Sequence, residues 1–67
     1  MEVADTYLMI KDELESARAE EAEALRRANR LRTTGASPEA LRDALREVDL
    51  QHSRVIHLQM ELRRQLH

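Results

Sequence analysis

Residues 32–40 read RTTGASPEA, and this stretch decides how the rest of the chain is arranged. Gly35 can adopt the left-handed conformation that follows the last turn of a helix. Ser37 can cap the start of a following helix, and Pro38 suits the first position of that helix. The stretch therefore predicts a helix, a short turn and a second helix. A connection this short folds the two helices back against each other as an antiparallel αα-hairpin.

The extent of each predicted element follows from this turn. We expect a helix over about residues 3–33, a turn over about 34–37 and a helix over about 38–66, within a single domain over 1–67. The composition agrees, because the chain is rich in Ala, Leu, Glu and Arg and has one Gly, one Pro and 1% aromatic residues. The fold class is therefore all-α, with two long helices packed as a coiled coil.

The apolar residues of both helices follow a heptad pattern. The stripe of the first helix starts at Val3 and alternates steps of four and three, and in the second helix Leu45 and Leu66 support a stripe that repeats every seven residues. Such a pattern predicts the seam of a coiled coil. Folding about the turn sets Ala28 opposite Leu45. The predicted seam residues are Tyr7, Ile10, Leu14, Ala17, Leu31, Leu41, Val48, Val55, Leu58 and Leu62.

One layer of the predicted seam is polar, because the same register sets Glu21 against Gln51 and His52. A carboxylate that faces an amide and an imidazole can fix the register of a coiled coil at some cost in stability. Alternatively, Glu21 leans to the solvent at the edge of the seam. A contact between Glu21 and His52 can also depend on pH. The sequence leaves these interpretations open.

The charges are unevenly distributed along the chain. The net charge is −2, from 11 basic and 13 acidic residues, and most of the acids fall in residues 1–23. Arg26, Arg27, Arg30 and Arg32 follow without an intervening acid. In the hairpin register these arginines lie beside the acids of the second helix. We therefore expect much of the charge to be paired within the hairpin.

Composition excludes several kinds of chemistry. The chain has no cysteine, so disulfides and thiolate metal sites are ruled out. His57 and Glu61 lie one helical turn apart but lack a third ligand at a suitable spacing. Ser16, Ser37 and Ser53 have no histidine–acid arrangement beside them. We expect no catalytic residues, no metal and no cofactor.

The chain also lacks the segments that place a protein in or across a membrane. No stretch approaches the roughly 20 apolar residues that span a bilayer. The N-terminal MEVADTYLMI lacks the basic start and long apolar core of a signal peptide. We expect a protein without a membrane span and a cytoplasmic location.

Four apolar residues are left outside the predicted seam. Leu8 and Met9 in the first helix, and Ile56 and Met60 in the second, belong to the open end of the hairpin. A chain of this length buries too little surface to be comfortably stable alone. We therefore predict that these four residues bind a partner protein or a second copy of the chain.

These features favour a non-enzymatic protein–protein interaction module, either an adaptor or co-chaperone or one half of a homodimeric four-helix bundle. The alternative is a dimeric four-helix-bundle regulator that binds another regulator, or that binds RNA as the plasmid copy-control hairpin proteins do. Arg26, Arg27 and Arg30 would then contact phosphates. Nucleic acid is disfavoured, because the chain has no aromatic platform and no surplus of positive charge.

The segment ALRRANRLRTTGASPEALRDAL, followed by an apolar stretch at Val55, Ile56 and Leu58, resembles the small E-component co-chaperones of type III secretion systems. The resemblance implies a helical hairpin that, with a TPR-fold partner, holds the needle subunit soluble before export. It also implies that the partner grips the apolar face of the second helix. The residues that carry the resemblance are Ala24, Leu25, Leu31, Gly35, Pro38 and Glu39.

A second stretch, LREVD at residues 45–49, resembles the SQELD motif of the sporulation-control phosphatases. Glu47 and Asp49 match the motif and Val48 is conservative, whereas Leu45 and Arg46 stand where the motif has Ser and Gln. The resemblance implies an aspartyl-phosphate phosphatase as a further alternative.

Overall fold

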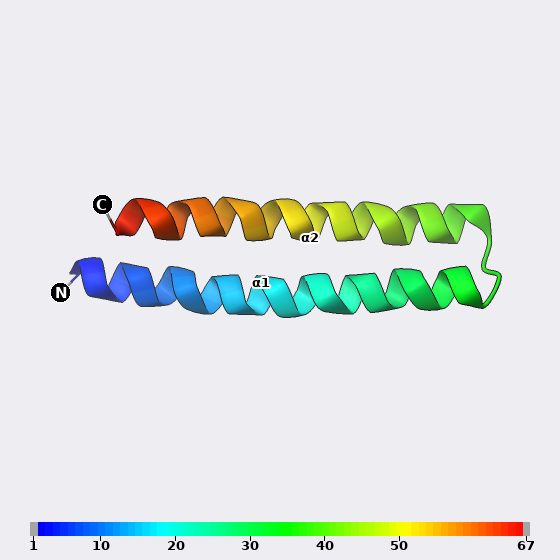
Figure 1. Ribbon diagram of the computed structural model, residues 1–67, viewed down its shortest axis with the longest axis horizontal. Coiled ribbons are helices and arrows are strands. Elements are labelled where there is room, and N and C mark those ends of the chain that lie inside the picture. Colours follow the sequence, from blue (N-terminus) through cyan, green and yellow to red (C-terminus); the bar gives the residue numbers. More distant parts are fainter. Residues whose placement is uncertain (1, 67) are drawn as a thin grey trace.

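The computed structural model describes residues 2–66, and the side chains of residues 5–66. Helix α1 spans Glu2–Thr33 and helix α2 spans Pro38–Gln65. The helices lie side by side and antiparallel, so that the start of α1 and the end of α2 share one end of the molecule (Figure 1). The predicted all-α antiparallel hairpin is confirmed. The predicted helix bounds differ from these by no more than one residue at either end.

The end of α1 is a left-handed cap. Gly35 has a φ of 74°, and the next amide, that of Ala36, donates a 3.1 Å hydrogen bond to the carbonyl of Leu31. The amide of Thr34 donates a 3.0 Å bond to the carbonyl of Arg30. These bonds satisfy carbonyls that the end of a helix leaves without partners, and the positive φ suits glycine because it has no Cβ. Gly35 therefore reverses the chain in the way its position predicts.

The start of α2 is capped by Ser37. Its hydroxyl oxygen accepts a 3.1 Å hydrogen bond from the amide of Ala40, and its carbonyl accepts a 3.1 Å bond from the amide of Leu41. Pro38 takes the first position of the helix, where its missing N–H costs nothing. Glu39 places a negative charge in the first turn, where the helix dipole favours it.

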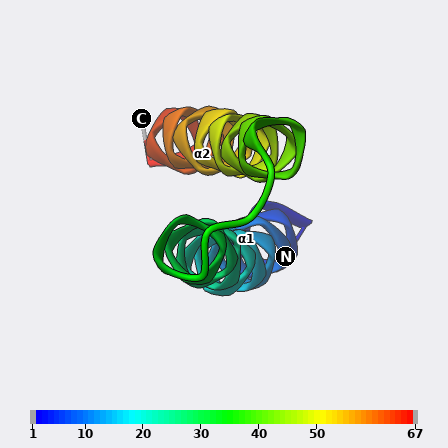
Figure 2. The same ribbon diagram turned by 90° about the vertical axis from the view of Figure 1, so that its right-hand side faces the viewer.

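The hairpin is long and thin, with extents of 51 × 14 × 12 Å. Seen from the turn end, the two helices form two layers that cross slightly (Figure 2). Each helix can therefore bury only the stripe that faces its partner. The buried apolar side chains are Leu14, Ala17, Ala24, Ala28, Ala44 and Val55.

The predicted seam lies between the helices. Leu14, Ala17 and Val55 form one buried cluster, and Leu58 and Leu62 pack against it. The side chain of Val3 lies outside the described residues. The other predicted seam residues are half-buried: Tyr7, Ile10, Leu31, Leu41 and Val48.

The prediction that Leu45 and Leu66 belong to the seam is wrong. Their side chains are 50% and 68% exposed. The inward-facing stripe of α2 instead continues in alternating steps of three and four, so that Ala44 is buried and Gln65 is half-buried. Most of the buried residues are alanines, which let the helix axes approach closely. Leu45 follows the seam position of Ala44 by one residue, and it therefore lies beside the seam.

Replacing Gly35 by L-alanine is expected to lower the free energy of unfolding by about 1 kcal/mol. A Cβ at this position meets no atom within 4 Å, so the cost comes from the backbone at positive φ alone. A chain of 67 residues can be synthesised chemically, which makes D-alanine at position 35 the matched control. The D residue favours this φ and is expected to raise stability. Urea unfolding measures both variants, and equal stabilities would contradict this account of the turn.

The Ala17→Leu variant is expected to lower the free energy of unfolding by about 1–3 kcal/mol, because a larger side chain forces apart a closely packed seam. Ala17 is fully buried, whereas Ala19 on the same helix is exposed. Ala19→Leu is therefore the matched control, with an expected change within about 0.5 kcal/mol. Thermal unfolding followed by circular dichroism measures both. An unchanged stability of Ala17→Leu would show that the seam has room for a side chain larger than alanine, and it would contradict the prediction.

Candidate functional site

The hairpin has two flanks, one on each side of the seam. Successive residues of a helix turn by about 100°, so residues one and four positions after a seam residue lie on the same side of the stripe. In α1 this rule places Leu25 beside the seam, four residues after Glu21. In α2 it places Leu45 there, four residues after Leu41. Leu25 and Leu45 line the same groove, so these sides of the two helices meet on one flank.

The groove between Leu25 and Leu45 lies near the turn and has a volume of about 450 Å³. Its floor is apolar, because Ala28 is buried and Leu41 is half-buried. Leu25 and Leu45 form its walls, and each is half exposed. The remaining lining residues are Arg26, Asn29 and Arg32.

Further apolar side chains continue along the same flank. Ile56 follows the seam residue Val55 by one position, Leu8 follows Tyr7 by one, and Leu66 follows Leu62 by four. All three are exposed. Five of the eight large apolar side chains that the described residues expose therefore lie on this side. We call it the apolar flank, defined by Leu8, Leu25, Leu45, Ile56 and Leu66.

The opposite side of the seam is mainly charged. Arg54 donates a 2.8 Å hydrogen bond from Nη1 to the Oε1 atom of Glu20, which joins the two helices there. By helix geometry Met9 and Leu50 are the exposed large apolar residues on this side. We call it the charged flank, defined by Glu13, Glu20, Arg27, Glu47, Arg54 and Glu61.

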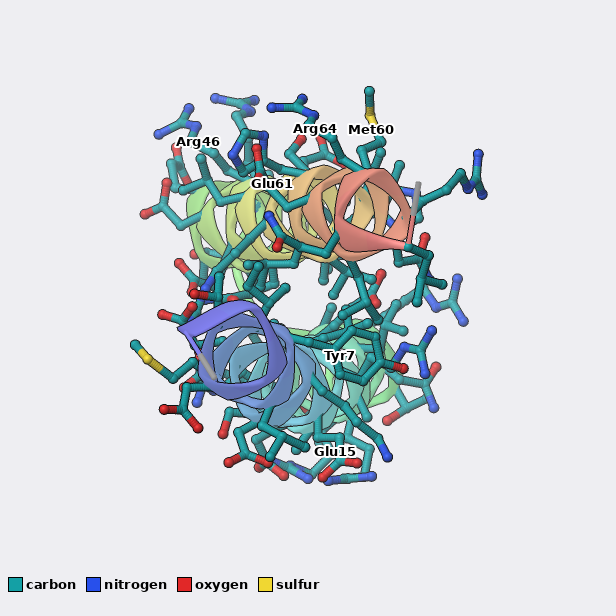
Figure 3. The ribbon with its side chains drawn as sticks, turned by 90° about the vertical axis from the view of Figure 1, so that its left-hand side faces the viewer. Tyr7, Glu15, Arg46, Met60, Glu61 and Arg64 are labelled. Carbon is teal, nitrogen blue, oxygen red and sulfur yellow. The ribbon has the colours of Figure 1, made fainter. Side chains whose placement is uncertain are left out.

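The four predicted partner-binding residues are all exposed, but they do not form one surface. Leu8 and Ile56 lie on the apolar flank, whereas Met9 lies on the charged flank. Met60 points away from α1 on the outer side of α2 (Figure 3). Leu25 and Leu45 were not among the predicted binding residues, although they line the groove. In the sequence, steps of three and then four residues from Leu41 reach Ala44 and Val48. This alternation is the signal that places Leu45 beside the seam.

The predicted polar layer is formed in part. The Nδ1 atom of His52 lies 2.7 Å from the Oε2 atom of Glu21, on the apolar flank. Gln51 does not join this contact: its amide nitrogen donates a 2.8 Å bond to Glu47 of its own helix. The amide oxygen of Gln51 is buried and accepts no hydrogen bond from the described residues. The layer therefore consists of one contact between the helices and one glutamine at the seam. The pH dependence of the contact stays a prediction.

The arginines near the turn pair within α1 rather than across the seam. Arg26 donates a 2.7 Å hydrogen bond to Glu23, and Arg30 lies 3.8 Å from the same carboxylate. Arg32 donates a 2.8 Å bond to the side-chain oxygen of Asn29. The prediction that these arginines pair with acids of the second helix is wrong for Arg26 and Arg30. Two of the three polar residues that line the groove are thus joined to each other.

Two further acidic residues that the sequence analysis considers, Glu61 and Glu47, each contact a residue of their own helix. The carboxylate of Glu61 lies 3.0 Å from the guanidinium of Arg64, and no three histidine or acidic side chains gather into a metal site within the described residues. In the stretch LREVD, Glu47 accepts the bond from Gln51. None of the helices over residues 2–66 is long and apolar enough to cross a membrane.

The pKa of the Glu23 carboxyl is expected to lie below its usual range, because Arg26 donates a hydrogen bond to the carboxylate and Arg26, Arg30 and Arg27 add positive charge nearby. A lowered pKa in the folded chain stabilises the fold above the usual pKa of glutamate. This stabilisation is lost as the pH falls through the lowered value. Titration followed by NMR measures it, and Arg26→Gln is expected to raise the pKa of Glu23. An unchanged value in Arg26→Gln would contradict the assignment.

In comparisons with known proteins, no family model matches this chain, and no curated protein and no solved structure matches it significantly. The resemblances to the secretion co-chaperones and to the SQELD phosphatases stay predictions. The geometry itself identifies a helical hairpin with one flank that is mainly charged and one, the apolar flank, that carries most of the exposed large apolar side chains among charged and polar ones.

Proposed function

We propose that this chain is a non-enzymatic protein–protein interaction module that binds a helical protein surface through its apolar flank. The observation that carries the proposal is the imbalance between the core and the surface. Among the described side chains eight large apolar ones are exposed, whereas only Leu14 and Val55 of the buried set are larger than alanine. Exposed apolar side chains gathered on one side of a charged molecule are typical of a binding surface. An adaptor or co-chaperone is one form that such a module takes.

The surface area of the hairpin supports the proposal. Its accessible surface is 5124 Å², whereas a compact monomer of 7.8 kDa exposes about 4,400 Å². The excess is close to the roughly 800 Å² that each partner buries in a standard protein–protein interface. Binding along one flank would cover about as much surface as the thin hairpin exposes in excess.

The shape and lining of the apolar flank favour a helix as the bound element. Two antiparallel helices leave a long shallow groove between them, into which the side chains of another helix pack. Apart from Arg26 and Arg32, the described residues that line the groove near the turn carry no ionisable group. Arginine and leucine side chains suit contact with another protein, and neither supplies a nucleophile or a base for catalysis at neutral pH.

A photoreactive amino acid at position 25, 45 or 56, introduced in the native host, is expected to cross-link the chain to a protein that mass spectrometry can identify. The matched control is position 50, because Leu50 is 61% exposed and lies on the charged flank. Cross-linking from the apolar flank should exceed that from position 50 several-fold. Equal yields from the two flanks, or none from the apolar flank, would overturn the proposal.

A further inference from the structure

The apolar flank of α2 is symmetric about Ile56. Asp49 lies seven residues before Ile56, and Arg63 lies seven residues after it. Leu45 lies eleven residues before Ile56 and Leu66 ten residues after it. If an antiparallel second copy of α2 places Ile56 opposite Ile56, Asp49 meets Arg63, and Leu45 comes within one residue of Leu66. The acidic residue then faces a basic one, and the two leucines lie close together.

The apolar flank of α1 has the same kind of symmetry. The midpoint of Glu15 and Arg18 falls between residues 16 and 17, and so does the midpoint of Leu8 and Leu25. All four residues lie one or four positions after a seam residue of α1. An antiparallel second copy of α1 centred there sets Glu15 opposite Arg18 and Leu8 opposite Leu25.

The two centres of symmetry lie at the same height in the hairpin. Ala17 and Val55 belong to one buried cluster, and Glu20 bonds to Arg54 across the seam. Residues 16–17 of α1 therefore lie beside residues 55–56 of α2. A single twofold axis can serve both helices.

We infer that a second copy of this chain binds the apolar flank, with the two hairpins antiparallel and Ile56 at the twofold axis, to form a four-helix bundle. This inference rests on the proposed function and names the partner. The apolar residues near the turn of one copy cover those at the open end of the other. Every pair of neighbouring helices in the bundle is antiparallel, as in up-and-down bundles.

The charged residues of the apolar flank support a second copy as the partner. Among the ion pairs within the described residues, none involves Glu15, Arg18, Asp49 or Arg63. In the antiparallel dimer each of these charges faces an opposite charge. A self-complementary patch is what a twofold interface requires, because each copy presents the same surface to the other.

The other twofold arrangement, with the axis along the helices, is disfavoured by charge. It places the turns of both copies together, which sets Arg32 opposite Arg42 and Lys11 opposite Arg63. Like charges that face each other across an interface are destabilising. The antiparallel arrangement instead sets Lys11 opposite Ala22 and Arg63 opposite Asp49.

The interface is large enough for a stable dimer. About 30 residues of α1 and about 20 residues of α2 overlap with the second copy, over about 45 Å and about 30 Å, and each helix is roughly 10 Å wide. The contact therefore covers roughly 750 Å² on each copy, close to the size of a standard interface. Specific protein–protein interfaces bury about 800 Å² on each partner.

Sedimentation of the purified full chain tests the inference, and the expected result is a dimer. Ile56→Glu places two carboxylates at the twofold axis and is expected to raise the dissociation constant at least about tenfold. The matched control is Leu50→Glu, which puts the same charge on the charged flank and should leave the dimer intact. A monomeric wild-type chain would overturn the inference, as would a larger effect of Leu50→Glu.

Charge reversal tests the register independently of folding. Asp49→Arg and Arg63→Asp are each expected to raise the dissociation constant about five- to tenfold, because the twofold axis repeats each lost pair. The double variant should restore association to within about twofold of the wild type. The two residues lie about 21 Å apart on one helix, so recovery requires contact between copies. Additive loss in the double variant would overturn the register.

Disulfide formation distinguishes the two arrangements, because the chain has no cysteine of its own. Ile56→Cys should link two copies readily, and an equimolar mixture of Leu8→Cys and Leu25→Cys should give mixed dimers. Linking of Leu25→Cys with Leu45→Cys instead would overturn the antiparallel arrangement. A monomeric chain whose apolar flank still cross-links to another protein would overturn this inference alone. An apolar flank that cross-links to nothing would overturn the proposed function as well.

Discussion

The seam between the two helices is the constraint on which the rest of the structure depends. A two-helix hairpin can bury only the stripe of each helix that faces the other, and here alanines form most of the buried part of that stripe. Alanine allows close approach but removes little apolar surface from water. The hairpin is thus well defined in shape and has a small core.

The phase of the heptad pattern decides what the surface looks like. Leu25 and Leu45 each follow a buried alanine of the seam by one residue, and they form the walls of a groove above Ala28 and Leu41. The charged flank is joined by the bond between Glu20 and Arg54, which holds the helices together without apolar contact. The division into two flanks follows from the heptad positions that the large apolar side chains occupy.

The fold could be predicted from the sequence because its signals are local. Gly35, Ser37 and Pro38 mark the end of one helix and the start of the next, and a short connection permits little besides a hairpin. The prediction that Leu45 and Leu66 lie in the seam is wrong because apolar character alone does not fix the phase of a helical stripe. Ala44 and Gln65 continue the alternation of three and four, and in a narrow seam the phase decides which residue is buried.

The candidate surface was harder to predict, because it depends on how two helices meet. Exposure of Leu8, Met9, Ile56 and Met60 follows from each helix alone. Whether these residues share a surface depends on which side of α1 adjoins which side of α2, and that is a property of the pair. The partner of Gln51 was also missed, since Glu47 one turn away competes with Glu21 across the seam. In the proposed antiparallel dimer the charges on the apolar flank have a clear role: they contribute little affinity, but they select one register among the many that a stripe of leucines would accept.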